Sequence, residues 1–180
     1  MRLSLPVTNI EKEMRDGEFL VSKTSLKGVI TYVNQPFIEM SGYTKEELIG
    51  QAHNLIRHPD MPPAAFEDFW KTLKQGRPWS GFVKNRAKDG SFYWVFANAT
   101  PINEAGQITG YLSVRSKPTR EQIRAAENLY REMREGRAKV KINAGDVVPL
   151  TLIGRLKQRL RFVSVRTRII MMLSFFSVII

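Results

Sequence analysis

The sequence predicts an α+β domain built on a five-stranded antiparallel sheet with short helices on one face, followed by a C-terminal helix and an apolar segment. Two short strand-like runs come first, several short helices and one longer amphipathic helix follow, and three further strand-like runs complete the series. This order, together with a hydrophobic content of 43% in 180 residues, is typical of one packed α+β domain with appendages.

The first part of the domain is expected to contain two strands and two short helices. Apolar residues at 19–21 and 29–33 predict the strands, with a tight link between them. Asn34 can cap a short helix that ends before Gly42. The spacing of residues 44–47 is that of a capping box, in which a threonine and a glutamate three residues later satisfy free N–H groups.

A longer helix is expected after Pro62 and Pro63, with Gly76 as its end. One face carries apolar side chains at helical spacing, namely Phe66, Phe69, Trp70 and Leu73. Acidic residues stand early in this helix and basic residues late, in the order that the helix dipole favours. We expect the aromatic face to pack on the sheet as core rather than to bind a cofactor.

The second half of the sheet is a predicted meander of three strands at 79–86, 92–100 and 108–114. Asp89-Gly90 and Ala105-Gly106 supply the turns between these strands. Together with the first two strands, the meander makes five antiparallel strands.

A capping box at 119–122 begins a further helix with a narrow apolar stripe. The stripe consists of Ile123, Ala126, Tyr130 and Met133. We expect such a stripe on a charged helix to serve docking or dimer contact rather than a core. The expected organisation is an N-terminal cap at 1–17, the domain at 18–117, a connecting helix at 118–136, a linker at 137–149, a basic segment at 150–168 and the start of a membrane anchor at 169–180.

The net charge of +11 is concentrated in the C-terminal part of the chain. Residues 1–114 carry 13 basic and 12 acidic groups, whereas residues 115–168 carry 15 basic and 5 acidic groups. Because these basic groups stand directly before an uncharged apolar run, they predict contact with a membrane surface and not with nucleic acid.

The apolar run at 169–180 has 12 residues, fewer than the roughly 20 that cross the hydrocarbon core as a helix. It is either a transmembrane helix that the chain cuts short or an interfacial anchor, and we expect the former. The basic residues ahead of it then place residues 1–168 on the cytoplasmic face of the inner membrane.

The residue types present exclude several kinds of site. The chain has no cysteine, which excludes disulfides, cysteine-ligated zinc, iron–sulfur clusters and a thiol–flavin adduct. Its two histidines, His53 and His58, are too few for a multi-histidine metal site. Paired carboxylates, a nucleophile beside a base and a phosphate-binding glycine loop are all absent from the sequence. We therefore expect no catalytic residue, no bound metal and no enzymatic activity.

The segment from Arg57 to Pro62 combines a cation, an imidazole and a carboxylate with two prolines that prevent a helix. Side chains held in this way can converge on a ligand, but the same run can be a loop in which Asp60 caps the next helix or pairs with Arg57. Trp79 is as readily a core residue as a stacking partner, and Asn34 can be a helix cap alone. From the residues alone, both interpretations stay open.

Several short motifs, taken together, resemble a known family. The first group comprises Ile30-Thr31-Tyr32-Val33-Asn34 with Phe37, Ser41-Gly42-Tyr43-Thr44 and Glu47-Leu48-Ile49-Gly50. This group is similar to the pattern of PAS domains. The second group comprises Arg57-His58-Pro59-Asp60-Met61-Pro62, Pro78-Trp79-Ser80-Gly81, Val83-Lys84-Asn85-Arg86, Gly90 and Tyr93-Trp94-Val95. It narrows the resemblance to the N-terminal FAD-binding PAS domain of bacterial aerotaxis receptors, over residues 21–136.

The resemblance implies a redox or oxygen sensor that holds FAD non-covalently and relays the flavin redox state to a membrane-linked chemotaxis signalling module. The flavin-binding residues carried over by position are Asn34, Arg57, His58, Asp60, Trp79, Asn85 and Asn98. The expected partners are FAD, the cytoplasmic membrane, a second copy of the chain, and the HAMP and methyl-accepting signalling module of the family, which these 180 residues do not include.

A flavin pocket needs an apolar wall, amide groups at the ring edge and a cation near the phosphates. Trp79 can stack on a ring, and Asn85 and Asn98 on neighbouring strands can read the ring edge. Arg57 can meet phosphate in a forked contact. For the histidine and the aspartate of the loop, direct contact and bracing of Arg57 both stay open, and so does FMN in place of FAD.

Two other functions stay open at this point. A heme-binding PAS sensor would use His53 or His58 as the axial ligand, and a Soret absorption band would indicate it. A ligand-free PAS interaction module would dimerise through residues 119–135 and the sheet, and a stable fold without a bound small molecule would indicate it.

Overall fold

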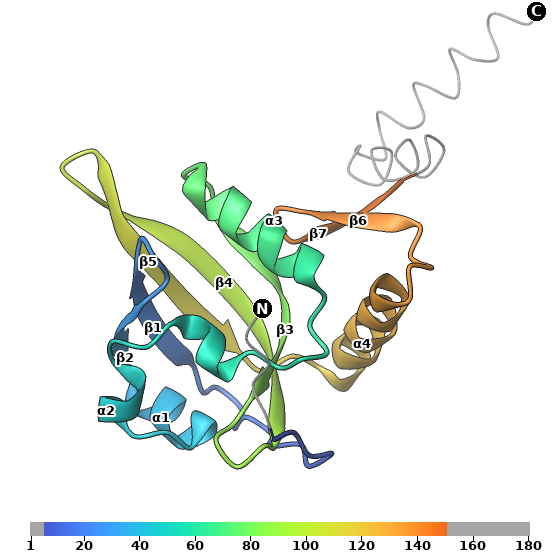
Figure 1. Ribbon diagram of the computed structural model, residues 1–180, viewed down its shortest axis with the longest axis horizontal. Coiled ribbons are helices and arrows are strands. Elements are labelled where there is room, and N and C mark those ends of the chain that lie inside the picture. Colours follow the sequence, from blue (N-terminus) through green and yellow to red (C-terminus); the bar gives the residue numbers. More distant parts are fainter. Residues whose placement is uncertain (1–5, 151–180) are drawn as a thin grey trace, which may run out of the picture. The chain divides into compact units, whose positions relative to one another are not determined.

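The structure, a computed structural model, describes residues 6–150 and contains the predicted five-stranded antiparallel sheet (Figure 1). The strands are β1 (Leu20–Ser25), β2 (Ile30–Val33), β3 (Trp79–Arg86), β4 (Phe92–Glu104) and β5 (Gln107–Ser116). Their order across the sheet is β2-β1-β5-β4-β3, so β1 and β5 lie in the middle of the sheet although the chain visits them first and last.

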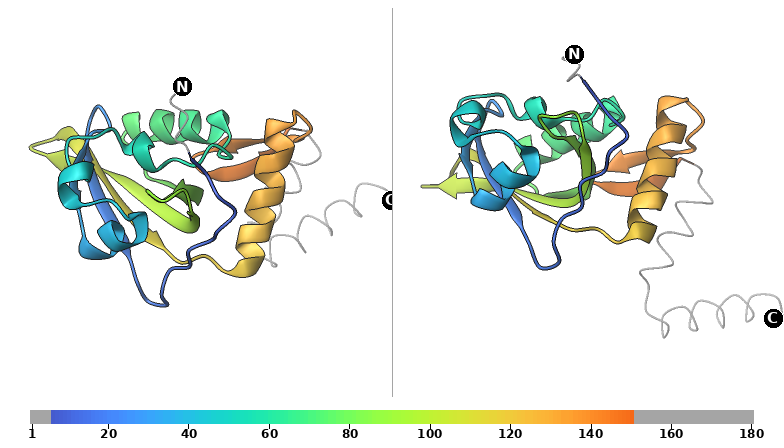
Figure 2. Two further views of the ribbon diagram at one scale, coloured as in Figure 1. Left: turned by 60° about the horizontal axis from the view of Figure 1, so that its bottom comes forward. Right: turned by 90° about the horizontal axis from the view of Figure 1, so that it is seen from below.

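Short helices cover one face of this sheet, as Figure 1 and Figure 2 show. They are α1 (Gln35–Ser41), α2 (Lys45–Leu48), a 3₁₀ turn at His53–Ile56 and α3 (Pro63–Lys74). The predicted caps are confirmed: the Asn34 side chain accepts the N–H of Phe37, and Thr44 and Glu47 form a capping box. The first residue of a helix has no intrahelical partner for its N–H group, so proline is well tolerated at the first position of α3. Pro62 and Pro63 therefore prevent a helix in the preceding loop but allow α3 to begin.

Strand β4 is longer than the sequence indicates. The predicted strand ended at Thr100, whereas β4 continues through Pro101, which cannot donate a ladder hydrogen bond, to Glu104. A register shift between Ile102 and Asn103 follows the proline in the β4–β5 pair. The turn at Ala105 and Gly106 has positive φ at both residues, as a tight hairpin requires.

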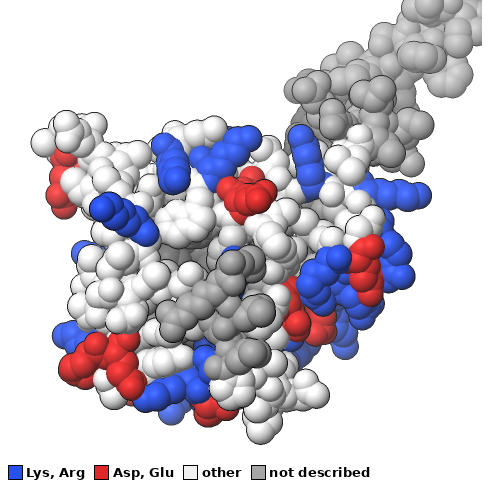
Figure 3. Space-filling model, viewed as in Figure 1, with Lys and Arg blue, Asp and Glu red and all other residues white. Residues whose placement is uncertain are grey.

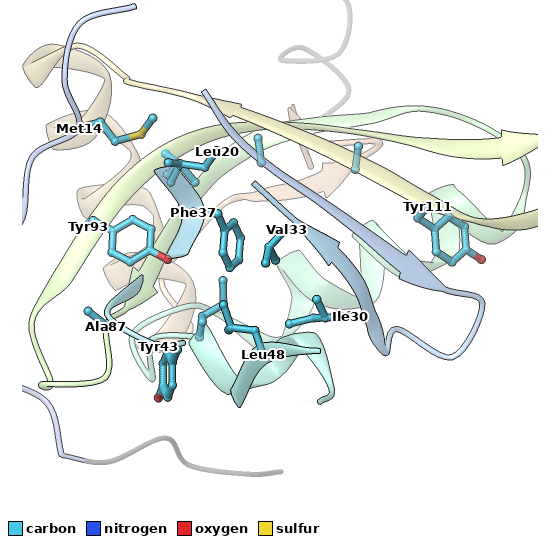
Figure 4. Packing of buried hydrophobic residues seen from close by; sticks show 14 of the residues in the cluster. Met14, Leu20, Ile30, Val33, Phe37, Tyr43, Leu48, Ala87, Tyr93 and Tyr111 are labelled. Atoms are coloured by element: carbon cyan, nitrogen blue, oxygen red, sulfur yellow. The ribbon is translucent and has the colours of Figure 1, made fainter. Parts of the chain in front are cut away.

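The main core lies between the sheet and helices α1 and α2. Phe37 of α1 is fully buried among apolar side chains from β1, β2, α2 and β4, and Figure 4 shows this packing. The residues drawn with Phe37 include Leu20, Val33, Leu48 and Tyr93. The burial of a side chain as large as Phe37 contributes about 2–3 kcal/mol to stability, so this cluster fixes α1 and α2 on one end of the sheet.

Helix α4 (Arg120–Arg134) begins with the predicted capping box at Thr119 and packs against the edge of the sheet. Tyr130 stacks on Trp94 with a centroid distance of 6.2 Å, and its hydroxyl donates to the Phe82 carbonyl at 2.6 Å. Ala126 and Tyr130 are buried in this contact. The interpretation of the apolar stripe as a docking surface was therefore wrong for these two residues, because the stripe serves the domain's own second core.

Residues 137–149, interpreted as a linker, contain a β-hairpin. Its strands are β6 (Val140–Asn143) and β7 (Asp146–Pro149), with Ala144 and Gly145 in the turn. Strands of only four residues give too short a pattern to be distinguished from a loop by sequence. The N-terminal segment also extends the fold, because Lys12 and Ile10 exchange backbone hydrogen bonds with Phe92 at the start of β4.

Of the described residues, 6–138 and 142–146 belong to one compact unit, and 139–141 and 147–150 belong to a second. In residues 6–150 no helix is both long and apolar enough to cross a membrane. The predicted apolar anchor at 169–180, and all of the predicted basic segment after Leu150, lie outside the described residues.

Candidate functional site

A cavity of about 550 Å³ lies between the sheet and helix α3. Small-molecule sites typically enclose about 300–1,000 Å³, so this cavity has the size of a ligand site. Its floor comes from β1, β3, β4 and β5, and its other walls from α3 and the 3₁₀ turn.

The period of two along each strand creates the floor. Alternate residues of β4 that face the cavity include Ala97 and Ala99, and β5 contributes Ser113 at the position that pairs with Ala99. Ser22 and Thr24 of β1 are also small. Because short side chains occupy the middle of the sheet where a core would carry large ones, space remains between the sheet and α3.

Aromatic side chains form the opposite wall. The ring centroid of Phe69, on α3, lies 5.1 Å from that of Trp79 and 4.9 Å from that of Trp70, and the rings meet edge to face in both pairs. The ring centroids of Trp70 and Tyr111 lie 5.7 Å apart. A Cβ at Gly28, which has a φ of +75°, would lie 2.9 Å from the Trp70 ring. The α3 aromatics, expected to be core alone, thus pack on the sheet and line the cavity with flat apolar surfaces.

A buried cation stands in the cavity wall. Arg115 of β5 is 4% exposed, donates to Ser22 Oγ at 3.0 Å and lies 2.8 Å from His53 Nε2. Its guanidinium also lies 5.4 Å from the centre of the Phe37 ring. Burial lowers the pKa of Arg115 to about 10. Burial, with the nearby charge of Arg115, lowers the pKa of His53 to about 3, so His53 is neutral at physiological pH.

This cation has no acidic partner in the part of the chain that the structure describes. Buried charges are normally paired, because an unpaired charge in a low-dielectric interior costs several kcal/mol. Among residues 6–150, four buried side-chain atoms also have no hydrogen-bond partner: Arg57 Nε, Asn85 Nδ2, Tyr93 Oη and Ser113 Oγ. Arg57, Asn85 and Ser113 line the cavity. A cavity whose wall holds the buried Arg115 cation without an acidic partner, together with three unsatisfied polar atoms, is suited to a polar aromatic ligand that carries negative charge.

Three of the residues predicted from the resemblance line this cavity: Arg57, Trp79 and Asn85. The backbone of Arg57 forms an isolated antiparallel bridge with Asn85, which brings the loop and β3 together. The Arg57 guanidinium lies 3.9 Å from the centre of the Phe66 ring and donates to the Met61 carbonyl at 3.3 Å. Burial lowers the pKa of Arg57.

His58 and Asp60 do not line the cavity and instead connect the loop to β3 and α4. Asp60 accepts a hydrogen bond of 2.6 Å from Lys84 Nζ, and its carbonyl accepts one from Arg134 of α4. Burial alone would raise the pKa of Asp60, but the hydrogen bond and charge of Lys84 outweigh it and lower that pKa. Buried His58 accepts the Asp60 N–H at 3.1 Å and meets the Phe92 ring edge-on. Burial, then the charge of Lys84, lower the pKa of His58 to about 4.

Asn34 and Asn98 also lie outside the cavity lining. Asn34 caps α1, and its side chain further accepts the N–H of Val21 and donates to the carbonyl of Phe19. Asn98 is exposed and accepts a hydrogen bond from Ser80 at 2.7 Å. Directly paired residues share a face of the sheet, and Asn98 pairs with Ser80, five residues from Asn85 along β3. The two asparagines therefore lie on opposite faces and are not brought together.

Four polar residues of the cavity lining were not predicted as flavin-binding residues from the sequence: Ser22, His53, Ser113 and Arg115. A signal for two of them was present, because Ser113 and Arg115 alternate with Leu112 and Val114 in a strand. Polar residues at the core-facing phase of a buried strand are unusual enough to indicate a site. The predicted strand ended at Val114, which left Arg115 outside it.

Charged side chains surround this part of the molecule. Figure 3 shows Lys and Arg gathered over α3 and α4 on one face, with acidic groups among them. Lys27 and Lys74, both exposed, line the cavity together with Glu67. Within residues 6–150 no cluster of three or more His, Asp or Glu residues is placed to hold a metal ion.

Comparisons with protein families and with known sequences agree with the predicted resemblance. Residues 30–115 match the family model described as the PAS fold. The chain is 49% identical over 150 residues to the aerotaxis receptor of Escherichia coli strain K12, which covers 83% of this chain and 30% of the receptor. It is 34% identical over 95 residues to a nitrogen fixation regulatory protein of Klebsiella pneumoniae, which covers 52% of this chain and 19% of that protein. The chain thus spans less than a third of the length of these relatives.

Solved structures of light-oxygen-voltage (LOV) domains share the fold. One, from work on a flavin analogue, has a TM-score of 0.54 at 28% identity and covers 65% of this chain and 87% of that domain. The dark structure of the Aureochrome1 LOV photoreceptor has a TM-score of 0.54 at 22% identity, and covers 61% of this chain and 81% of that domain. At 22% identity, the second likeness concerns the fold alone.

Proposed function

Residues 30–115 belong to the PAS family, and we propose that they form the redox-sensing input domain of an aerotaxis receptor, with FAD held non-covalently in the cavity. The observation that carries this proposal is the cavity wall, in which the unpaired Arg115 cation and three unsatisfied polar atoms stand opposite an aromatic surface. The identity of 49% with an aerotaxis receptor supports the assignment to this kind of sensor.

The residues present fit a flavin. A flavin ring system is flat and aromatic, has a polar edge with donors and acceptors, and gains negative charge when it is reduced. Phe69, Trp70 and Trp79 offer aromatic surfaces, and Asn85 and Ser113 offer groups for the polar edge. When bound, the flavin supplies reversible electron transfer, while the cysteine-free chain rules out a cysteinyl adduct.

Each group of the chain has a separate part in this proposal. Arg115, held by Ser22 and His53, compensates negative charge on the ligand without having to reorganise. Arg57, held against Phe66, closes the side of the cavity next to Asn85. His58 and Asp60 position Arg57 by fixing the loop to β3 and α4, and Asn34 fixes α1 beside β1.

Heme is less well supported by the placement of the histidines. His58 does not line the cavity, and the Nε2 atom of His53 lies 2.8 Å from the Arg115 guanidinium. A cation at this distance disfavours coordination of a metal ion by the same nitrogen. The ligand-free interaction module is less well supported, because three polar atoms in the cavity wall have no partner in the protein and would have only water to bind.

The remaining parts of the proposal follow from the sequence and from the aerotaxis receptor similarity. We propose that the basic segment at 150–168 and the apolar segment at 169–180 attach the domain to the cytoplasmic face of the inner membrane. A second copy of the chain and a HAMP and methyl-accepting signalling module are the proposed partners, and the proposed domain at 18–117 is followed by the connecting helix at 118–136.

The experiment is flavin binding by the protein and by two matched variants. Protein purified from flavin-replete cells should be yellow and bleach with dithionite, and the released cofactor should have the mass of FAD. Asn85→Ala should weaken FAD binding about tenfold, since about 1–1.5 kcal/mol is lost per buried hydrogen bond.

Asn98→Ala is the matched control, because it removes the same group from the neighbouring strand on the opposite face of the sheet. It should leave FAD affinity unchanged. A colourless protein that takes up no added FAD would refute the proposal, and equal effects of the two substitutions would refute the assignment of the site.

A further inference from the structure

Asp68 joins the cavity wall to the turn of the C-terminal hairpin. Its half-buried carboxylate, on α3, accepts a hydrogen bond of 2.8 Å at Oδ2 from the indole Nε1 of Trp79. The same carboxylate accepts the backbone N–H groups of Ala144, at 2.9 Å to Oδ1, and of Gly145, at 2.8 Å to Oδ2. Figure 1 shows the β6–β7 turn next to α3. One side chain thus holds a cavity residue and a turn 76 residues further along the chain.

The turn itself fits closely against β3. A Cβ at Gly145 would overlap the carbonyl oxygen of Ser80, the residue next to Trp79. Ala144 has a φ of +53°, a conformation that costs a residue with a side chain about 1–2 kcal/mol. Such a conformation persists when surrounding contacts determine it. The hydrogen bonds from Ala144 and Gly145 to Asp68 are contacts of this kind.

The hydrogen bonding of the Asp68 carboxylate depends in part on Trp79. The carboxylate accepts three N–H donors and forms no ion pair in the described chain, so neutral donors alone stabilise its charge. Hydrogen bonds to an ionised acceptor are the strong ones. A ligand in the cavity restricts the orientations of the Trp79 ring, and thereby favours the arrangement in which the indole N–H reaches Asp68.

We propose that Asp68 is a positioning residue that couples occupation of the cavity at Trp79 to docking of the Ala144–Gly145 turn. This inference rests on the proposed flavin as the occupant of the cavity. Coupling between two sites is reciprocal. Bound FAD therefore holds the turn in place, and the docked turn strengthens FAD binding by the same factor.

The test is amide hydrogen exchange at Ala144 and Gly145 in the full 180-residue chain, with and without FAD. FAD should slow exchange of these two amides about fivefold, the lower end of typical couplings. Asp68→Asn should speed their exchange and abolish the FAD effect. Trp79→Phe keeps a ring in the wall but removes the indole N–H, and should also abolish the FAD effect. Asp146→Asn removes an exposed acid of the same hairpin, and it should change neither the exchange of the Ala144 and Gly145 amides nor the effect of FAD on that exchange.

Reciprocity supplies a second measurement. Gly145→Ala should displace the turn and weaken FAD binding about fivefold, although residue 145 does not line the cavity. The coupling is overturned if FAD binds while exchange at Ala144 and Gly145 stays the same, or if Asp68→Asn exchanges like the wild type. Failure to bind FAD would instead refute the proposed function. In that case the link from Trp79 through Asp68 to the turn can be tested without FAD. It is overturned if the Ala144 and Gly145 amides exchange in Trp79→Phe as they do in the wild type.

Discussion

Replacement of Arg115 by methionine tests whether this cation serves ligand binding or stability, because the two roles predict different effects on FAD affinity and on the free energy of unfolding. Arg115 is buried with two neutral hydrogen-bond partners and no acidic partner among residues 6–150. Its pKa is lowered to about 10 from an ordinary value of 12.5. Each pKa unit corresponds to 1.36 kcal/mol, so burial of the charged form costs about 3 kcal/mol.

Methionine removes this cost and fills a similar apolar volume. Ser22 Oγ and His53 Nε2 lie 3.5 Å apart and remain available to each other, so neither is left without a partner. We therefore expect the free energy of unfolding of flavin-free Arg115→Met to be unchanged or to rise by about 1–3 kcal/mol. FAD affinity should fall by at least about tenfold, since a hydrogen bond to a charged group contributes about 1.5–3 kcal/mol.

Arg86→Met is the matched control. Arg86 is also 4% exposed, but it donates to the Pro6 carbonyl at 2.6 Å and to the Tyr43 hydroxyl at 2.9 Å, and it does not line the cavity. Its loss leaves acceptors unsatisfied and should lower the free energy of unfolding by about 2–4 kcal/mol without changing FAD affinity.

Urea unfolding of the flavin-free proteins, followed by tryptophan fluorescence, gives the stability, and quenching of flavin fluorescence gives the affinity. A flavin-free Arg115→Met variant that loses more than about 2 kcal/mol and still binds FAD normally would refute the reasoning, because Arg115 would then act as a structural group.

Three further predictions concern stability and access to the cavity. The pKa of His58 is lowered to about 4 and that of His53 to about 3, against 6.5, so the unfolded chain binds both protons more tightly, and a shift from pH 7.5 to pH 5 should remove about 2 kcal/mol of stability per histidine in urea unfolding. In His58→Gln the His58 part of the pH dependence should vanish. Ala97→Leu extends a side chain into the cavity and should weaken FAD binding at least about tenfold in a fluorescence titration while circular dichroism stays unchanged. Thr119→Ala removes the cap of α4 and should cost about 1 kcal/mol, with faster amide exchange in its first turn.

The sequence was sufficient for the elements whose signals are local. Caps at Asn34, Thr44 and Thr119, the prolines before α3 and the glycine turns of the meander each act within a few residues, and the structure confirms them. The β6–β7 hairpin was missed because its turn is stabilised by Asp68, a residue distant in sequence. No local pattern reports a contact of that kind.

The candidate site was harder to predict because it depends on register. Asn85 and Asn98 are equivalent as sequence signals, and only the pairing of Asn98 with Ser80 shows that they face opposite sides. The cavity also arises from small residues, such as Ala97, Ala99 and Ser113, that no chemical motif singles out. The strand alternation marks Arg115 as a polar residue at a core-facing position, but its burial and its lack of an acidic partner among residues 6–150 come from the structure.

The loop from Arg57 to Asp60 shows how one charged motif divides between two tasks. Extended backbone at Arg57 and its bridge to Asn85 place the Arg57 side chain in the cavity wall. Asp60 instead meets Lys84, the neighbour of Asn85 that faces the other side of β3, and Arg134 of α4. We therefore expect a change at Asp60 to shift Arg57 through the loop and to weaken ligand binding without loss of a ligand contact. A binding defect at this position is thus evidence that the loop is held in place, and only the effect of Arg57 itself reports on contact with the ligand.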